Sequence, residues 1–420
     1  MADFHEQTKI SEEFIMPENT NTVPHGSTVT LDVVNGDLEV EEHATIRAVH
    51  TQVKVSGTVY FEGNCVFECS LSAENLDGEG DITIQGDLEI KDRVNIEDGR
   101  LTVNGNMKAQ KADVDRSLEV DKNFEVEEVD VGGSLRVHGT TTTKEIDVGG
   151  TFEAESQVKA ENIEAGGSVR INAKVEADEI EVGGSAIVNG GKVEKVDVGG
   201  TFVSNDSLEF GTIDVGGTVK LTGENVGGDI DVGGSCRIEG NLKFKTLDVG
   251  GVIEISGNGE GQNIDVGGKV SVGKELRLSG ELDVGGRAEV GEQLNAERIE
   301  VGGSLRAKEA TVTDDVDVGG SIETNNGITA NRVRIGRRGE VRGPIHAKEV
   351  IVGERARVED VYADKIVLEE KAQARNLYGQ SIHLEYKCEV HGEVLYTESL
   401  KTEETVYFTK PPRKVEKLPS

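Results

Sequence analysis

An acidic residue stands directly before each copy of a short glycine motif, and the spacing of these acids is the most chemically suggestive feature of the sequence. Carboxylate oxygens are the ligands that calcium and magnesium prefer in proteins. One acid per turn of a repeating structure would form an outward column at the strand spacing of about 4.8 Å. Such a column either collects divalent cations or forms a solvated stripe that keeps molecules apart. The absence of a dense, alternating acidic loop favours the stripe. The acids are Asp130, Asp147, Glu164, Glu181, Asp197, Asp214, Asp231, Asp248, Asp265, Asp283, Glu300 and Asp317.

Other residues with reactive side chains are sparse. His383, Cys388 and His391 are close in sequence, but they alternate along an expected strand, which favours scattered surface and core positions over a metal site. The four cysteines lack zinc-ligand spacing, and Cys236 falls at an expected core position. No Ser-His-Asp set or phosphate-binding loop is present, because the glycine motif lacks the lysine and following helix of a P-loop. We therefore assign no catalytic, cofactor-binding or metal-binding residue.

The glycine motif itself predicts the fold. A constant short period means that every unit lays the same element on its neighbour, which is the signature of a solenoid. Successive copies of the motif are nearly equally spaced along the chain. Val-Gly-Gly, once replaced by Ala-Gly-Gly, starts at residues 131, 148, 165, 182, 198, 215, 232, 249, 266, 284, 301 and 318.

Apolar residues recur in three pairs per period, and the members of each pair are two residues apart. That is the strand period, so both side chains of a pair face one side, and the shift between pairs makes a corner. Three strands and three corners predict an all-β, three-sided parallel β-helix with about 17 residues per turn. Examples of the pairs are Leu135 and Val137, Val158 and Ala160, and Ile146 and Val148.

Composition and charge narrow the function classes. Hydrophobic residues make up 35% and aromatic residues 4% of the 420 residues, with no Trp, which suits a thin repeated core better than one large core. The net charge of -34 argues against a nucleic-acid partner. Without a signal peptide or a long apolar run, we expect a cytoplasmic protein. Acidic residues surround Phe14-Ile15-Met16, so we expect membrane contact to be weak or absent.

The turns after the glycine repeats resemble those of the bactofilin family of polymer-forming cytoskeletal proteins. The resemblance lies in residues 341–352, 361–368 and 377–384. Turns of that family typically alternate as Val-x-Gly-x-Val/Ile-x-Ala followed by a Val/Ile-x-Val/Leu pair. It implies a right-handed β-helix that assembles end to end without nucleotide, with tails on both sides. This chain would be an unusually long member.

These patterns predict three segments. Residues 1–28 are expected to be a disordered N-terminal tail, and residues 409–420 a basic, Pro-rich C-terminal tail. Residues 29–408 are expected to form a single β-helical solenoid, with regular glycine repeats over 131–320 and bactofilin-like turns over 341–400.

The ends of a solenoid must either be capped or pair with another chain. Large apolar residues come just before the C-terminal tail, and we expect them either to cap the last turn or to mediate self-association. They are Tyr396, Val406, Tyr407 and Phe408. The tail either bundles with the acidic body of another molecule, or binds a protein partner, or only solubilises the chain. Its candidate residues are Lys410, Pro411, Pro412, Arg413, Lys414 and Lys417.

We therefore expect a non-enzymatic structural protein that forms homopolymers through its β-helix ends and needs no cofactor. An isolated scaffold and a surface fibre or adhesin are the alternatives. A β-helical enzyme acting on polysaccharides fits less well, because sugar clefts need aromatic platforms and long loops.

Overall fold

The computed structural model describes residues 21–419, and these residues form 52 β-strands and no helix. The chain divides into two units, Met1–Gly200 and Thr201–Ser420. In each unit, successive turns pair in parallel, as in β18 with β21 and β33 with β36. The predicted all-β parallel solenoid is thereby confirmed.

The strands of the first unit are β1 (Thr22–Val23), β2 (Thr28–Leu31), β3 (Val33–Val34), β4 (Leu38–Val40), β5 (Thr45–Ala48), β6 (Gln52–Val55), β7 (Thr58–Glu62), β8 (Cys65–Phe67), β9 (Ser70–Ala73), β10 (Asn75–Glu79), β11 (Ile82–Ile84), β12 (Leu88–Ile90), β13 (Arg93–Glu97), β14 (Arg100–Val103), β15 (Met107–Val114), β16 (Ser117–Val120), β17 (Phe124–Val131), β18 (Ser134–Val137), β19 (Thr141–Thr142), β20 (Glu145–Val148), β21 (Thr151–Ala154), β22 (Val158–Lys159), β23 (Asn162–Ala165), β24 (Ser168–Ile171), β25 (Val175–Val182), β26 (Ser185–Val188) and β27 (Gly191–Val198).

The strands of the second unit are β28 (Thr201–Ser204), β29 (Leu208–Val215), β30 (Thr218–Val232), β31 (Ser235–Lys243), β32 (Thr246–Val249), β33 (Val252–Ile255), β34 (Gly259–Gly261), β35 (Asn263–Val266), β36 (Lys269–Val272), β37 (Leu276–Leu278), β38 (Glu281–Val284), β39 (Arg287–Ala296), β40 (Arg298–Val301), β41 (Ser304–Val312), β42 (Asp315–Val318), β43 (Ser321–Thr324), β44 (Ile328–Ile335), β45 (Glu340–Arg342), β46 (Ile345–Val352), β47 (Arg357–Leu368), β48 (Gln373–Leu384), β49 (Glu389–Val390), β50 (Val394–Thr402), β51 (Tyr407–Phe408) and β52 (Arg413–Lys414).

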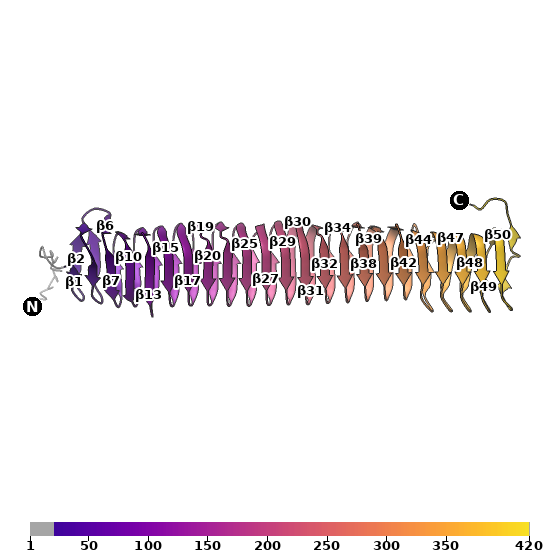
Figure 1. Cartoon of the computed structure of the whole chain (residues 1–420), viewed down its shortest axis with the longest axis horizontal. Coiled ribbons are helices and arrows are strands. Elements are labelled where there is room, and N and C mark those ends of the chain that lie inside the picture. The colour runs from indigo at the N-terminus through magenta and orange to yellow at the C-terminus, as the bar shows by residue number, and fades with distance from the viewer. Residues whose placement is uncertain (1–20, 420) are drawn as a thin grey trace, which may run out of the picture. The chain divides into compact units, whose positions relative to one another are not determined.

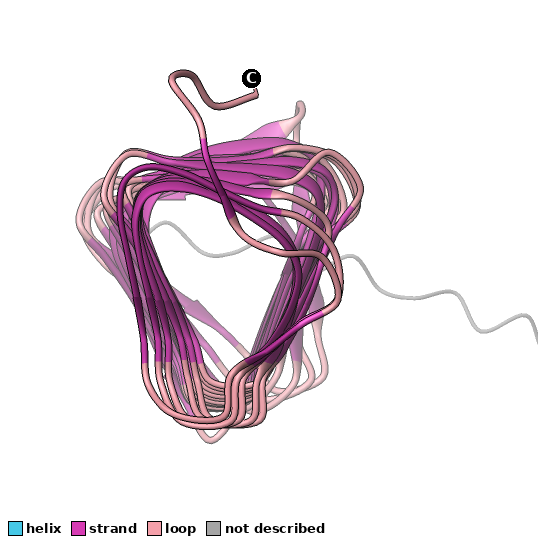
Figure 2. Cartoon of the chain, turned by 90° about the vertical axis from the view of Figure 1, so that its right-hand side faces the viewer, coloured by secondary structure: helices cyan, strands magenta, loops and turns pink. Residues whose placement is uncertain are grey.

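Each turn has three faces separated by three corners, and Figure 2 shows this triangular section in the turns nearest the viewer. Face 1 follows the Gly-Gly corner, face 2 comes next, and face 3 leads into the following Gly-Gly corner. In the turn that begins at the corner after Val131, these faces are β18, β19 and β20. Long strands such as β25 run through a corner and contribute to two faces.

The register between turns is nearly constant. On face 3, Ile146 pairs with Ile163, which in turn pairs with Ile180 at the same separation. The separation is one residue shorter near the C-terminal end, where Val350 pairs with Ile366. One early turn is longer, because Val33 pairs with Lys54, and its extra loop projects between β5 and β6 (Figure 1). The predicted period is therefore confirmed for most turns, and one insertion departs from it.

The inward positions are those that the sequence predicts. Leu135, Val137, Ile146, Val148 and Val158 have no exposed surface. Stacking equivalent residues of successive turns builds columns of small aliphatic side chains, so each turn buries its core residues against the turns on either side. Each turn therefore depends chiefly on its two neighbours.

The Gly-Gly corners are explained by close backbone approach. None of the described glycines of this motif has a positive φ. A Cβ on Gly149 would lie 2.3 Å from the carbonyl oxygen of Gly132, and one on Gly251 would lie 2.3 Å from that of Gly234. Stacking one corner directly on the previous corner thus excludes any side chain.

The last turns build the same corner differently. Here non-glycine residues adopt a left-handed conformation, with φ of 61° at Arg338, 60° at Arg355, 60° at Lys371 and 58° at Lys387. The backbone N–H groups of Arg338 and Arg355 donate to carbonyl oxygens of the following turn, at 2.8 and 2.9 Å. The change of corner explains why the glycine repeat stops although the solenoid continues.

Both predicted segment boundaries differ from the structure. Strands β1 and β2 begin within residues 21–28, which the sequence assigned to a disordered tail, and β1 pairs with β4. Residues 1–20 lie outside the described residues. At the other end, β52 lies within the predicted tail 409–420 and pairs with β50 through Leu395 and Tyr396. Strand pairing therefore extends past both predicted boundaries of the solenoid.

Replacing Gly233 and Gly234 with Val tests the corner. Added Cβ atoms would lie 2.6 and 2.4 Å from carbonyl oxygens of the preceding corner, so we expect local destabilisation of about 2–3 kcal/mol. Hydrogen exchange should show protection lost over two or three turns, whereas Ser235→Ala should leave it unchanged. Uniform loss along the chain would contradict nearest-neighbour stacking.

Thr141→Val should stabilise the first unit by about 1–2 kcal/mol, because the Thr141 hydroxyl is buried without a hydrogen-bond partner. Thr143→Val is the matched control. The Thr143 hydroxyl donates to the carbonyl oxygens of Glu127 and Glu145, both at 3.1 Å, so its removal should cost stability. Native-state hydrogen exchange around β19 measures both effects. A loss of protection in Thr141→Val would show that the hydroxyl has a role in the core.

Candidate functional site

The acids singled out in the sequence form an outward column on face 3 of each unit. Asp130, Asp147, Glu164 and Glu181 are successive partners in the parallel ladder of the first unit. The column of the second unit ends where Asp317 pairs with Arg334. The predicted stacking of these acids is confirmed.

Three acids of the column have a raised pKa. Burial, and then the carboxylates of neighbouring turns, raise the pKa of Asp130 and Asp248 above the usual range. For Glu164 the largest cause of the raised pKa is the negative charge of Asp147. The charged forms of these acids are therefore disfavoured in the folded state. Neighbouring acids of the column thus repel one another at these positions.

Ion pairs between turns occur on all three faces. In the first unit, Arg136 lies 2.6 Å from Glu153, and Lys159 lies 2.9 Å from Glu176. In the second unit, Arg237 binds Glu254 in the same way, at 2.8 Å. Exposed pairs of this kind contribute little stability. Face 3 has such pairs as well, and there Lys195 lies 2.6 Å from Glu179, beside the acidic column.

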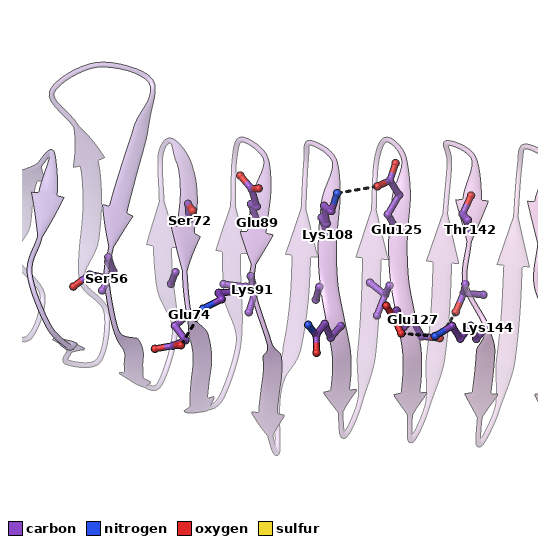
Figure 3. Close-up of a pocket in the computed structure, with 17 residues that line it drawn as sticks. Ser56, Ser72, Glu74, Glu89, Lys91, Lys108, Glu125, Glu127, Thr142 and Lys144 are labelled. Atoms are coloured by element: carbon purple, nitrogen blue, oxygen red, sulfur yellow. Dashed lines mark hydrogen bonds and ion pairs between the residues drawn. The ribbon is translucent and has the colours of Figure 1, made fainter.

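A groove of about 820 Å³ runs over face 2 of the first unit. Small side chains, including Ala73 and Ala109, lie along it, and charged side chains flank it (Figure 3). These charges pair with each other across turns, as Lys144 does with Glu127 at 2.6 Å. The described residues that line the groove include no histidine, cysteine or aromatic side chain. The described lining therefore offers no aromatic stacking platform for a sugar.

The four self-association candidates lie in the last two turns, but they do not share one orientation. Phe408 pairs with the buried Val390 and is half-buried, so it occupies a core position. Tyr407 points outward and is 58% exposed. Tyr396 and Val406 are half-buried. The sequence did not distinguish the inward Phe408 from the outward Tyr407.

The basic tail is bound to its own unit. Lys410 lies 3.4 Å and Arg413 lies 3.8 Å from the carboxylate of Glu393. Arg413 and Lys414 form β52, and the backbone N–H of Val415 donates to the carbonyl of Tyr396 at 2.9 Å. Pro411 and Lys417 are exposed, and Pro412 is half-buried. The tail therefore extends face 2 by a short strand.

Sequence reasoning missed one residue of this end. Leu400 is the ladder partner of the buried Ile382, yet it is only half-buried because no described strand lies beyond it. The repeat period indicates an inward residue near this position. A bulge between Gly379 and Ser381 lengthens the separation between ladder partners by one residue. Leu400 and Phe408 thus present two partly uncovered core positions on faces 3 and 1.

The three donors close together in sequence do not converge in the described structure. Cys388 is buried, with its thiol 3.1 Å from the carbonyl oxygen of Glu369, and burial raises its pKa to about 11. His391 lies 3.6 Å from Glu389 on face 1. His383 lies on face 3 beside Val367. Cys236 is buried, as the sequence predicts, and its pKa is raised to about 12 by burial.

Asp248→Asn should stabilise the second unit at pH 7 by about 0.5 kcal/mol, because it removes a charge that is disfavoured by burial and then by the neighbouring acids of the column. Because the folded-state pKa of Asp248 is raised, folding is less favourable when its carboxylate is charged than when it is protonated. The gain should disappear as the pH falls below the ordinary aspartate value of about 3.9. Denaturant unfolding at several pH values measures it.

Asp229→Asn is the control, and we expect it to change stability in the opposite direction. The Thr246 hydroxyl donates to the Asp229 carboxylate at 2.5 Å and lowers its pKa, so this substitution should reduce stability at pH 7. Equal gains from both substitutions would contradict a repulsive column, since they would reflect the loss of any negative charge.

No family model, curated protein or solved structure matches the sequence. The function must therefore be argued from the faces and ends of the two units.

Proposed function

We propose that this protein is a non-enzymatic structural element that assembles end to end, without nucleotide, through the C-terminal end of its second unit. The observation that carries the proposal is the open last turn. Among the described strands, none pairs with the outer edge of β51 or of residues 399–402 in β50. An uncovered strand edge is a template for pairing with another chain.

The side chains at this end support the same conclusion. Leu400 and Phe408 occupy core positions and remain partly exposed. In the first turn of the first unit, by contrast, Val23 and Val29 are completely buried. Pairing a further chain with the last turn would remove the apolar surface of Leu400 and Phe408 from water, which favours association.

The charge distribution favours ends over sides. The acidic columns of face 3 repel one another when two molecules approach side by side, and the Debye length of about 8 Å at physiological salt leaves close approach unfavourable. At the open strand edges of the last turn, an approaching molecule meets no comparable column of acidic side chains. Strand pairing and apolar burial at the junction also require no bound nucleotide.

The resemblance of residues 341–400 to bactofilin turns favours the same function, and we accordingly place the protein in the cytoplasm. A scaffold that does not polymerise, and a surface fibre, are the alternatives, and the open edge favours assembly over both. Among the described residues, no helix is long and apolar enough to cross a membrane.

Phe408→Arg should prevent assembly, because the charge would be buried unpaired in the junction. We expect the protein concentration needed for assembly to rise at least tenfold, equivalent to about 1.4 kcal/mol. Tyr407→Arg is the matched control, because this neighbour points outward. Sedimentation velocity measures assembly, and circular dichroism checks that the β content is unchanged.

If the Phe408→Arg variant assembles as well as the wild type, the C-terminal end does not mediate assembly. Failure of both variants to assemble would show that charge near the end, and not burial of the inward ring, controls association.

A further inference from the structure

A cluster of three possible metal ligands lies on the first unit, away from the groove and from the C-terminal end. Glu119 belongs to β16, and Asp121 follows that strand at the corner between faces 1 and 2. His138 follows β18, one turn later. Val120 and Val137 are ladder partners, so Asp121 and His138 are the next residues in register on adjacent turns.

The backbone fixes the positions from which these side chains extend. The N–H of Asp121 donates to the carbonyl of Val103 at 2.9 Å, and the N–H of His138 donates to that of Val120 at 3.0 Å. Both residues are therefore held by the ladder at one strand spacing from each other. The cluster is set by the stacking of turns and does not depend on a long loop.

The donor atoms converge. Nε2 of His138 lies 3.6 Å from Oε1 of Glu119, and one ligand atom from each of the three residues lies within 4.8 Å of the others. Zinc binds imidazole nitrogen and carboxylate oxygen at about 2.0–2.2 Å, so a cation between these atoms needs only small side-chain rotations. All three side chains are exposed, which makes such rotations inexpensive.

The local charge also favours a cation. The nearest guanidinium on the ladder is that of Arg136, the Cα partner of Glu119, but it binds Glu153 at 2.6 Å. In the described part of the chain, Glu119 lies within 4.0 Å of the basic nitrogen of His138 alone, and Asp121 is within that distance of no basic nitrogen. Two carboxylates thus converge on an imidazole without a lysine or arginine to neutralise them.

We propose that Glu119, Asp121 and His138 bind one divalent transition-metal ion of the zinc class, with water completing the coordination. An imidazole ligand suits zinc, nickel or copper, whereas calcium and magnesium take oxygen ligands. The ion ties two successive turns together at the corner between faces 1 and 2. This site is independent of the proposed assembly function.

Calorimetric titration of the full chain with zinc tests the site. His138→Ala should remove one zinc equivalent or weaken its binding at least tenfold, and Asp121→Asn should weaken it in the same direction. His391→Ala is the matched control, because His391 has a carboxylate at 3.6 Å but belongs to no three-donor group among the described residues. Zinc should also increase hydrogen-exchange protection in β16 and β18, and this increase should be absent in His138→Ala.

Two results would overturn the proposal. One is zinc uptake of the same stoichiometry and affinity in the wild type and in His138→Ala, which would place any bound zinc elsewhere. The other is calcium binding as tight as zinc binding and unaffected by His138→Ala, which would indicate a general attraction of cations to the acidic surface.

Discussion

The constraint on which the structure depends is the parallel backbone ladder between successive turns. Because each turn must pair with the next at about 4.8 Å, equivalent positions stack into columns, and the residue type of one turn determines what its neighbours can tolerate. The Gly-Gly corner follows directly, since a Cβ on Gly149 would lie 2.3 Å from the carbonyl oxygen of Gly132. At the equivalent corner of the last turns, Arg338 and Lys371 adopt a left-handed backbone conformation instead.

The same stacking distributes charge and leaves the end open. Asp147 and Glu164 face each other on adjacent turns of face 3, and their repulsion raises the pKa of Glu164. Pairs such as Arg237 with Glu254 join opposite charges on adjacent turns. At the last turn the ladder stops, and Phe408 retains an incompletely covered core position. Repulsion on one side and an open edge at one end together favour association through the end.

Sequence periodicity could predict what every turn repeats, which includes the three inward pairs, the near-constant length of a turn and the acidic column. It could not predict features that occur once. The long turn between Val33 and Lys54 and the strand β52 in the basic tail depend on local pairing without a repeated signal. The orientation of Tyr407 relative to Phe408 required the exact register of the last turn. The proximity of Asp121 and His138 depends on the stacking of adjacent turns, because the two residues are distant along the chain.

Electron cryo-microscopy of the assembled full-length protein tests end-mediated assembly most directly. The account predicts filaments in which the strand spacing of about 4.8 Å continues across each junction, with Phe408 and Leu400 buried between two molecules. Separate particles at all concentrations, or assemblies joined along their faces with the C-terminal ends exposed, would contradict it.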